Sequence, residues 1–245
     1  MRQAGLVLIG VGLLLIASCR TPTPTSTPVP SPTPTPTPSP AEIAHLAGEQ
    51  MLSTDSLHFV IVLSGKLTFL DSPPTLALKR AEGDLVRPDR VRAIIKVSSF
   101  GMTSEVAIVG LGDEQYITNP LNQQWEKLPP GQGWHFDPTL IFDPEVGIKP
   151  ILNETTWSFG AKEEIGGQKH YRLYAQLPGE QVSPLTAGMI APGRVVVDAW
   201  TGEQDTYVRR IQIVELDSDP ENPTQWLIEF SAFDEPVDIE APPDP

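Results

Sequence analysis

The sequence Glu82-Gly-Asp-Leu-Val-Arg-Pro-Asp-Arg90, with the residues that follow it to Leu128, decides the fold. After Arg90, apolar and charged residues alternate with a period of two, which is typical of a strand with one buried face. Turn-like Gly and Pro residues separate this run from three further short β-type runs. The stretch therefore predicts an antiparallel meander. Its four strands are expected at residues 90–97, 103–109, 115–118 and 125–128.

The same patterns predict an α+β domain on both sides of this stretch. Leu57 to Phe69 carries Leu57, Phe59, Ile61, Leu63, Leu67 and Phe69 on one parity, which indicates a long strand with one buried face. A further strand is expected at 75–86, and five more lie beyond the meander, which gives about eleven in all. Helices are expected at 41–52, in the Pro-interrupted segment 139–152 and at 183–191. The later strands are predicted at residues 155–165, 168–177, 194–200, 206–216 and 225–233.

The N-terminus has the features of a bacterial lipoprotein signal. Arg2 precedes an apolar run that ends in Ile16-Ala17-Ser18-Cys19, and small residues before a cleavage point are typical of a signal peptide. Cys19 is the only cysteine, and its position resembles the lipobox, in which the cysteine becomes the acylated first residue. We therefore expect a signal peptide over 1–18 and a lipid anchor on Cys19. The alternatives are an ordinary signal peptide with an incidental cysteine, or an uncleaved anchor.

Two low-complexity segments flank the domain, which is expected over 41–234. The segment 19–40 contains the anchor and Thr-Pro repeats, and proline rules out both helix and sheet there. An extended polyproline linker of this length reaches roughly 60 Å from the membrane. The acidic, Pro-rich tail 235–245 is expected to be disordered.

Charge and motifs exclude several classes of protein. The chain has 31 acidic and 17 basic residues, so nucleic acid is not an expected partner. Its four histidines are far apart in the sequence, and no nucleotide, nucleophile-elbow or zinc-site motif is present. The acidic turn 217–222 lacks the glycine and the terminal Glu of a calcium loop. We expect no enzyme, no cofactor and no metal site.

Two apolar clusters fall in segments that should connect strands. Connecting segments are normally polar, so such clusters must pack on something. They either complete the core or cover a concave sheet with an apolar gap beneath them. The clusters are Trp134, Phe136, Leu140, Ile141 and Phe142, and Leu185, Met189 and Ile190.

The domain resembles a known lipoprotein family. The resemblance rests on the lipobox, Ser64-Gly65-Lys66, the stretch 82–90, Ile117-Thr-Asn-Pro-Leu121 and Trp125-Glu-Lys-Leu-Pro129. These features are similar to the LppX/LprA/LprF/LprG lipoproteins, whose fold is similar to that of the LolA and LolB carriers. The resemblance implies a curved, half-closed antiparallel sheet with helices on its concave face and acyl chains held between them.

That resemblance implies an extracytoplasmic protein, anchored to the bacterial cell membrane, that binds and carries lipid or acylated cargo. The alternative is a sensor or protein-interaction module of the envelope, with a possible envelope protein as partner. An apolar void of several hundred Å³ would favour the carrier. A filled core with a large exposed apolar patch would favour the interaction module. The expected cavity residues are the two clusters above together with Phe59, Ile61, Leu63, Val91, Ile95 and Ile108.

Overall fold

The computed structural model describes residues 38–70, 74–120, 122–129, 138–186 and 188–243. Cys19, Trp134 and Phe136 therefore lie outside the described residues. Residues 38–245 form one compact unit. Among the described residues, no helix has the length and apolar content needed to cross a membrane.

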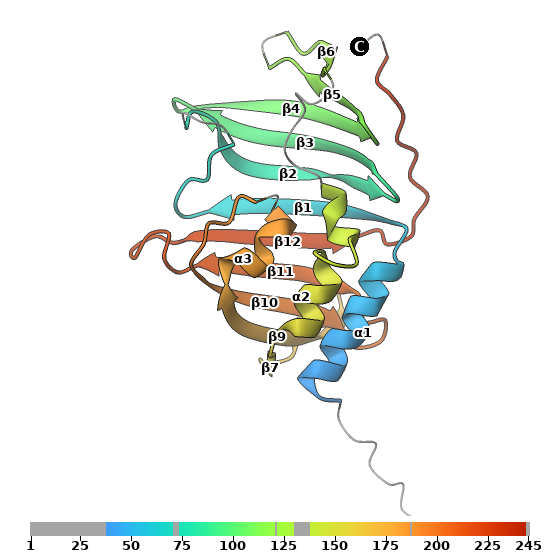
Figure 1. Ribbon diagram of the computed structural model, residues 1–245, viewed down its shortest axis with the longest axis vertical. Coiled ribbons are helices and arrows are strands. Elements are labelled where there is room, and N and C mark those ends of the chain that lie inside the picture. Colours follow the sequence, from blue (N-terminus) through green and yellow to red (C-terminus); the bar gives the residue numbers. More distant parts are fainter. Residues whose placement is uncertain (1–37, 71–73, 121, 130–137, 187, 244–245) are drawn as a thin grey trace, which may run out of the picture. The chain divides into compact units, whose positions relative to one another are not determined.

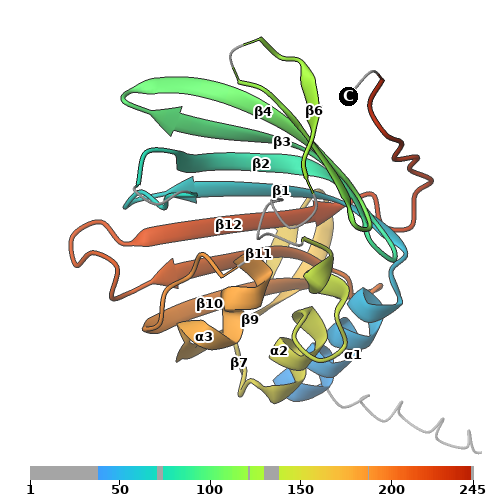
Figure 2. The same cartoon turned by 45° about the horizontal axis from the view of Figure 1, so that its top comes forward.

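A 12-stranded antiparallel sheet forms the body of this unit, and it is curved and open (Figures 1 and 2). Its strand order is β6-β5-β4-β3-β2-β1-β12-β11-β10-β9-β7, with β8 paired to β9. The N-terminal meander thus meets the C-terminal one where β1 pairs with β12, from His58–Ser231 to Ser64–Gln225. The strands are β1 Ser56–Ser64, β2 Ala77–Val86, β3 Arg90–Ser99, β4 Met102–Leu111, β5 Glu114–Thr118, β6 Trp125–Lys127, β7 Ser158–Phe159, β8 Glu163–Ile165, β9 Gln168–Pro178, β10 Arg194–Gly202, β11 Val208–Glu215 and β12 Thr224–Ser231.

The predicted α+β class and the antiparallel meander are confirmed, with two differences. The single strand predicted over 155–165 is two short pieces, β7 and β8, which accounts for the twelfth strand. The strand predicted over 57–69 ends at Ser64, because the chain turns at Gly65 with φ of 78°. A Cβ at Gly65 would lie 2.0 Å from the Pro223 carbonyl oxygen, so only glycine fits there.

The first helix, α1 (Pro40–Ser53), begins earlier than the sequence predicts. The Glu42 N–H donates to Ser39 Oγ at 3.2 Å, and the Ser39 N–H donates to the Glu42 carboxylate at 2.7 Å. This is a capping box, with Pro40 in the first turn. Ser39 is therefore part of the domain and not of the linker, which corrects the predicted boundary at residue 40.

Short helices cover the concave face of the sheet, mainly over β1 and β9–β12 (Figures 1 and 2). They are the 3-10 helix η1 (Pro138–Phe142), α2 (Ile148–Glu154), α3 (Gly179–Val182) and the 3-10 helix η2 (Ser183–Thr186). Helix α2 packs against α1, and η1 touches η2. We call η1 and η2 the cover. The predicted short helices around 139–152 and 183–191 are thus present.

The C-terminal tail differs from the expected disorder. It is described as far as Pro243, and Ile239 is only 1% exposed. Ile239 packs with Val109 of β4 and Tyr116 of β5, and Val237 joins the same small cluster. The alternating apolar residues of the tail cover a part of the sheet that would otherwise face water, which offsets the entropy of ordering the segment.

Candidate functional site

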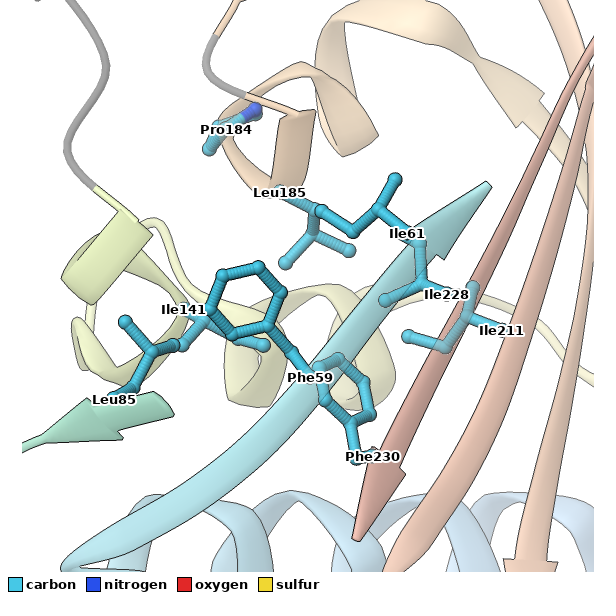
Figure 3. Close-up of a pocket in the computed structure, with 9 residues that line it drawn as sticks. All are labelled: Phe59, Ile61, Leu85, Ile141, Pro184, Leu185, Ile211, Ile228 and Phe230. Atoms are coloured by element: carbon cyan, nitrogen blue, oxygen red, sulfur yellow. The ribbon is translucent and has the colours of Figure 1, made fainter. Parts of the chain in front are cut away.

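A small cavity lies between the concave face of the sheet and the cover (Figure 3). It has a volume of about 30 Å³, and every residue that lines it is apolar. Strands β1, β2, β11 and β12 form its floor, and η1 and η2 form its roof. The lining residues are Phe59, Ile61, Leu85, Ile141, Pro184, Leu185, Ile211, Ile228 and Phe230.

Sheet register aligns the floor of this cavity. Phe59 of β1 pairs with Phe230 of β12, and Ile61 pairs with Ile228, which in turn pairs with Ile211 of β11. Directly paired residues point to the same face of a sheet, so these side chains form a continuous apolar surface. In Figure 3, Leu185 of η2 lies above that surface, and Ile141 of η1 lies beside Phe59 on the side of Leu85.

The volume of the cavity decides what it can hold in this conformation. At about 10–15 Å³ for each enclosed water, a cavity of 30 Å³ has room for about two waters. Pockets that hold drug-sized ligands have volumes of roughly 300–1,000 Å³. This cavity is therefore far smaller than the several-hundred-Å³ void that would favour a carrier, and an acyl chain fits in it only if the cover moves.

Four of the predicted cavity residues line the cavity, namely Phe59, Ile61, Ile141 and Leu185. The others that the structure describes lie elsewhere in the same hydrophobic core or at its margin. Leu63, Val91, Ile108, Phe142 and Ile190 are buried, Ile95 and Met189 are partly buried against them, and Leu140 is half-buried.

Phe142 is held inside the core by a basic side chain. Its ring is 3% exposed, and the Arg87 guanidinium lies 4.4 Å from the ring centroid. Arg87 also donates to the carbonyl oxygens of Leu52, at 2.5 Å, and Thr54, at 2.6 Å. Burial lowers the pKa of Arg87. Phe142 thus ties η1 to the end of α1 and is not at the edge of the cavity.

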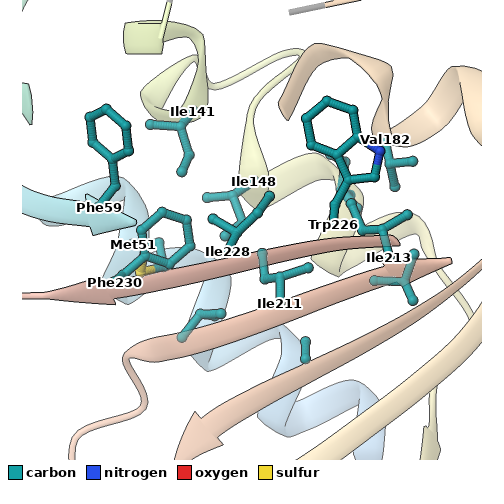
Figure 4. Packing of buried hydrophobic residues seen from close by; sticks show 14 of the residues in the cluster. Met51, Phe59, Ile141, Ile148, Val182, Ile211, Ile213, Trp226, Ile228 and Phe230 are labelled. Atoms are coloured by element: carbon teal, nitrogen blue, oxygen red, sulfur yellow. The ribbon is translucent and has the colours of Figure 1, made fainter. Parts of the chain in front are cut away.

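Sequence reasoning missed five lining residues: Leu85, Pro184, Ile211, Ile228 and Phe230. Ile228 and Phe230 share one parity with Trp226, which is the sequence signal that could have placed them on a common face. Their place opposite Phe59 and Ile61 depends on the β1–β12 pairing, which joins residues far apart in the chain. Figure 4 shows the layer that results, with Trp226 beside Val182 of α3 and with Met51 of α1 near Phe230.

A second, more polar hollow of about 380 Å³ opens at the end of the sheet where β1 and β12 meet. Leu67, Phe69 and Met189 line it together with the carboxyl group of Glu215. Glu215 is 8% exposed, and the Trp226 indole N–H donates to its carboxylate at 2.7 Å. Burial raises the pKa of Glu215. A buried carboxyl group beside apolar residues gives this hollow a mixed character, unlike the wholly apolar cavity.

His58 and His170 lie on different strands and in different surroundings. His58 Nδ1 lies 2.8 Å from Asp84 Oδ1 on β2, while His170 is fully buried on β9. Burial lowers the pKa of His170, and its Nδ1 lies 2.8 Å from the Gln168 carbonyl oxygen. Among the described residues, no three His, Cys, Asp or Glu side chains are grouped as metal ligands would be.

Comparison with solved structures shows the same fold in mycobacterial lipoproteins. LprF from Mycobacterium bovis aligns with a TM-score of 0.65 and 15% identity, covering 83% of this chain and 96% of that one. Lipoprotein LppX from Mycobacterium tuberculosis aligns with a TM-score of 0.57 and 17% identity, covering 82% and 98%. No curated protein matches the sequence significantly. The family model described as "LppX_LprAFG lipoprotein" matches residues 39–239, so the chain belongs to the LppX_LprAFG lipoprotein family.

Proposed function

We propose that this protein is a membrane-anchored lipoprotein of the cell envelope that binds a lipid acyl chain between its sheet and its cover. One observation carries the proposal: all nine residues around the cavity are apolar, on the floor and on the roof. The side chains that line this site carry no polar group that must be desolvated or satisfied. It suits a hydrocarbon chain and offers nothing for catalysis, so we infer a non-enzymatic binding role.

We infer that the cover moves as short units. Its hydrogen bonds include local ones, such as Asp143 N–H to Leu140 O at 3.0 Å after η1. In η2, Ser183 Oγ donates to Ile190 O at 3.0 Å, and Thr186 Oγ1 donates to Ser183 O at 3.1 Å. A shift of Ile141 and of η2 that leaves Phe142 and its Arg87 contact in place can preserve these bonds and the hydrogen bonds between strands. It would join the cavity to the space that Ile141 and Leu185 fill.

The energies favour opening in the presence of a lipid. Exposing one fully buried Ile or Leu costs about 1.5–3 kcal/mol, so withdrawing buried Ile141 and half-buried Leu185 costs no more than roughly 3–6 kcal/mol. Each buried methylene contributes ~0.8 kcal/mol, so about ten methylenes contribute on the order of 8 kcal/mol. An acyl chain thus offsets the cost of parting the cover, whereas water does not.

The anchor places this binding site at a membrane. In the proposed mature protein, Cys19 is acylated and the Thr-Pro segment links it to Ser39, outside the cytoplasm. Because two or three acyl chains hold a protein firmly, the acidic domain needs no attraction to anionic lipid headgroups. We propose that the domain carries lipids or acylated proteins across the envelope from this position.

A protein-interaction or sensor role is the second candidate, and two observations favour it. The cavity holds only about 30 Å³ as the structure stands. Several large apolar side chains are also exposed, among them Phe100 at 90% and Met102 at 70%. In this role the core stays closed, and an exposed surface binds a protein of the envelope.

A reversible crosslink between η1 and η2 distinguishes lipid binding from the protein-interaction role. The variant Ile141→Cys/Leu185→Cys in residues 38–245 has no other cysteine, because Cys19 is the only one in the chain. We expect titration with a fluorescent fatty acid to show binding when the pair is reduced and a loss of binding when a short thiol crosslinker joins it. The reduced variant is the matched control. Equal binding in both states would refute a cover that opens.

A further inference from the structure

Two neighbouring hairpins end at the same end of the sheet. Ala77, at the start of β2, pairs with Ser98 of β3, and Ser98 pairs with Thr103 of β4. The β1–β2 loop and the β3–β4 turn therefore project side by side, as both views show (Figures 1 and 2). Their described residues carry six large apolar side chains, which we call the tip patch. These are Leu67 (46% exposed), Phe69 (39%), Leu70 (44%), Leu76 (39%), Phe100 (90%) and Met102 (70%).

Neither packing nor backbone preference explains why a phenylalanine occupies position 100. It has φ of 48° and is followed by Gly101 with φ of 81°, so both central residues of this two-residue turn are left-handed. Such turns favour Asn-Gly, because a bulky residue is strained at positive φ. Phe100 is also almost fully exposed and buries little apolar surface. An unfavourable residue kept at a strained and solvated position points to a role outside folding.

The charges of the tip patch set it apart from the rest of the chain. The chain has 31 acidic and 17 basic residues, yet the described residues of these two loops include Lys66 and no acidic residue. Asp71 is in the part of the loop that the structure does not describe. The adjacent β11–β12 loop, in contrast, contains Asp217, Asp219 and Glu221. The apolar tips can thus approach an uncharged hydrocarbon surface with few carboxylates to desolvate.

We propose that the tip patch inserts shallowly into the lipid bilayer to which the protein is anchored. The sequence between the proposed anchor and the domain supports a bilayer as the binding partner. It runs from Cys19 to Thr37, and a chain of this length spans roughly 60 Å when extended. A tether of this kind holds the domain at a high effective concentration near the membrane, so weak insertion suffices. The proposal rests on the anchor proposed above and not on acyl binding in the cavity.

This contact would also bring the polar hollow to the lipid surface. Leu67 and Phe69 of the tip patch line that hollow together with Met189 and Glu215. A bilayer touching the tip patch would therefore adjoin a concave entrance with a carboxyl group inside it. Lipid headgroups would meet two basic residues, Lys66 and Arg194, and two acidic ones, Glu215 and Asp217, while acyl chains would meet the apolar rim.

A depth-sensitive probe on the full-length lipidated chain tests the proposal. Met102→Cys is labelled with an environment-sensitive fluorophore and reconstituted into phosphatidylcholine vesicles that contain lipids brominated on their acyl chains. The control label is at Leu46→Cys, an exposed apolar position on α1 (49% exposed). We expect blue-shifted emission and several-fold stronger quenching at residue 102 than at residue 46. The replacement Phe100→Asn suits the turn and should preserve the fold, while it reduces quenching at residue 102.

The outcomes distinguish the tip patch from the anchor. Flotation with vesicles reports the anchor, and quenching reports the tips. A chain that floats with the vesicles but shows equal quenching at residues 102 and 46 would overturn the insertion of the tip patch and leave the anchor standing. The tips would then face water or a protein. Quenching unchanged by Phe100→Asn would overturn it as well. A wild-type chain that does not float would overturn both the anchor and the tip contact.

Discussion

Replacing Phe59 with alanine tests whether the volume of the cavity limits the binding of acyl chains. Phe59 is 3% exposed on β1, and its ring borders a cavity of about 30 Å³. Removing a buried ring costs roughly 3–5 kcal/mol of unfolding free energy, part of a total near 5–15 kcal/mol. The variant should therefore stay folded but be measurably less stable in urea.

The same replacement should strengthen acyl binding. If three more methylenes fit in the space of the lost ring, at ~0.8 kcal/mol each, the gain is about 2.4 kcal/mol. This corresponds to a roughly fifty-fold lower Kd, because 1.4 kcal/mol is a factor of ten. The measurement is a titration of residues 38–245 with a fluorescent fatty acid, beside urea unfolding of the same sample.

Leu173→Ala is the matched control for this experiment. Leu173 is fully buried on β9 and does not line the cavity, so its loss costs about 2–5 kcal/mol without enlarging the site. We expect this variant to bind the fatty acid as the wild type does. An unchanged or higher Kd for Phe59→Ala would refute the reasoning. So would an equal gain in both variants, since binding would then follow general loosening and not volume.

Three further predictions concern stability, each measured by urea unfolding. Burial raises the pKa of Glu215 in the folded protein, so the unfolding free energy should fall as the pH rises above about 4.3, the usual pKa of an unfolded glutamate. Glu215→Gln should make the unfolding free energy less dependent on pH, and an unchanged pH dependence would contradict this. Ser39→Ala should cost about 1 kcal/mol whereas Ser39→Asp should not, and equal losses would rule out capping. Truncation after Asp234 removes the contact of Ile239 with the sheet and should lower the unfolding free energy by roughly 1.5–3 kcal/mol, whereas Glu240→Gln should leave it unchanged. If the truncated chain is as stable as the wild type, the tail does not pack.

Local patterns predicted most of the sheet, because strands such as β1 and β12 alternate buried and more exposed residues along the chain. In β1 the parity of Leu57, Phe59, Ile61 and Leu63 is the parity that the structure buries. The pattern failed past Ser64, where Leu67 and Phe69 continue the parity but are exposed beyond the turn at Gly65. Periodicity records which residues are apolar, and it does not record where the backbone turns.

The candidate site could be predicted only in part, because its floor depends on contacts between distant parts of the chain. Ile61 and Ile228 are paired across the sheet, and no local pattern sets that register. The cavity volume was also beyond prediction, since it depends on how closely Ile141 and Leu185 fit the floor. The tail shows the reverse error: its acidic and Pro-rich composition favoured disorder, yet Val237 and Ile239 pack against the sheet.

Photocrosslinking of a bound fatty acid tests the central claim most directly. A fatty acid with a diazirine near its methyl end is bound to residues 38–245, irradiated and located by peptide mass spectrometry. The account predicts labels on Phe59 and Ile61 of β1, on Ile228 of β12 and on the cover at Ile141 and Leu185. Labels confined to exposed residues such as Leu67 and Phe100, with none between the sheet and the cover, would contradict it.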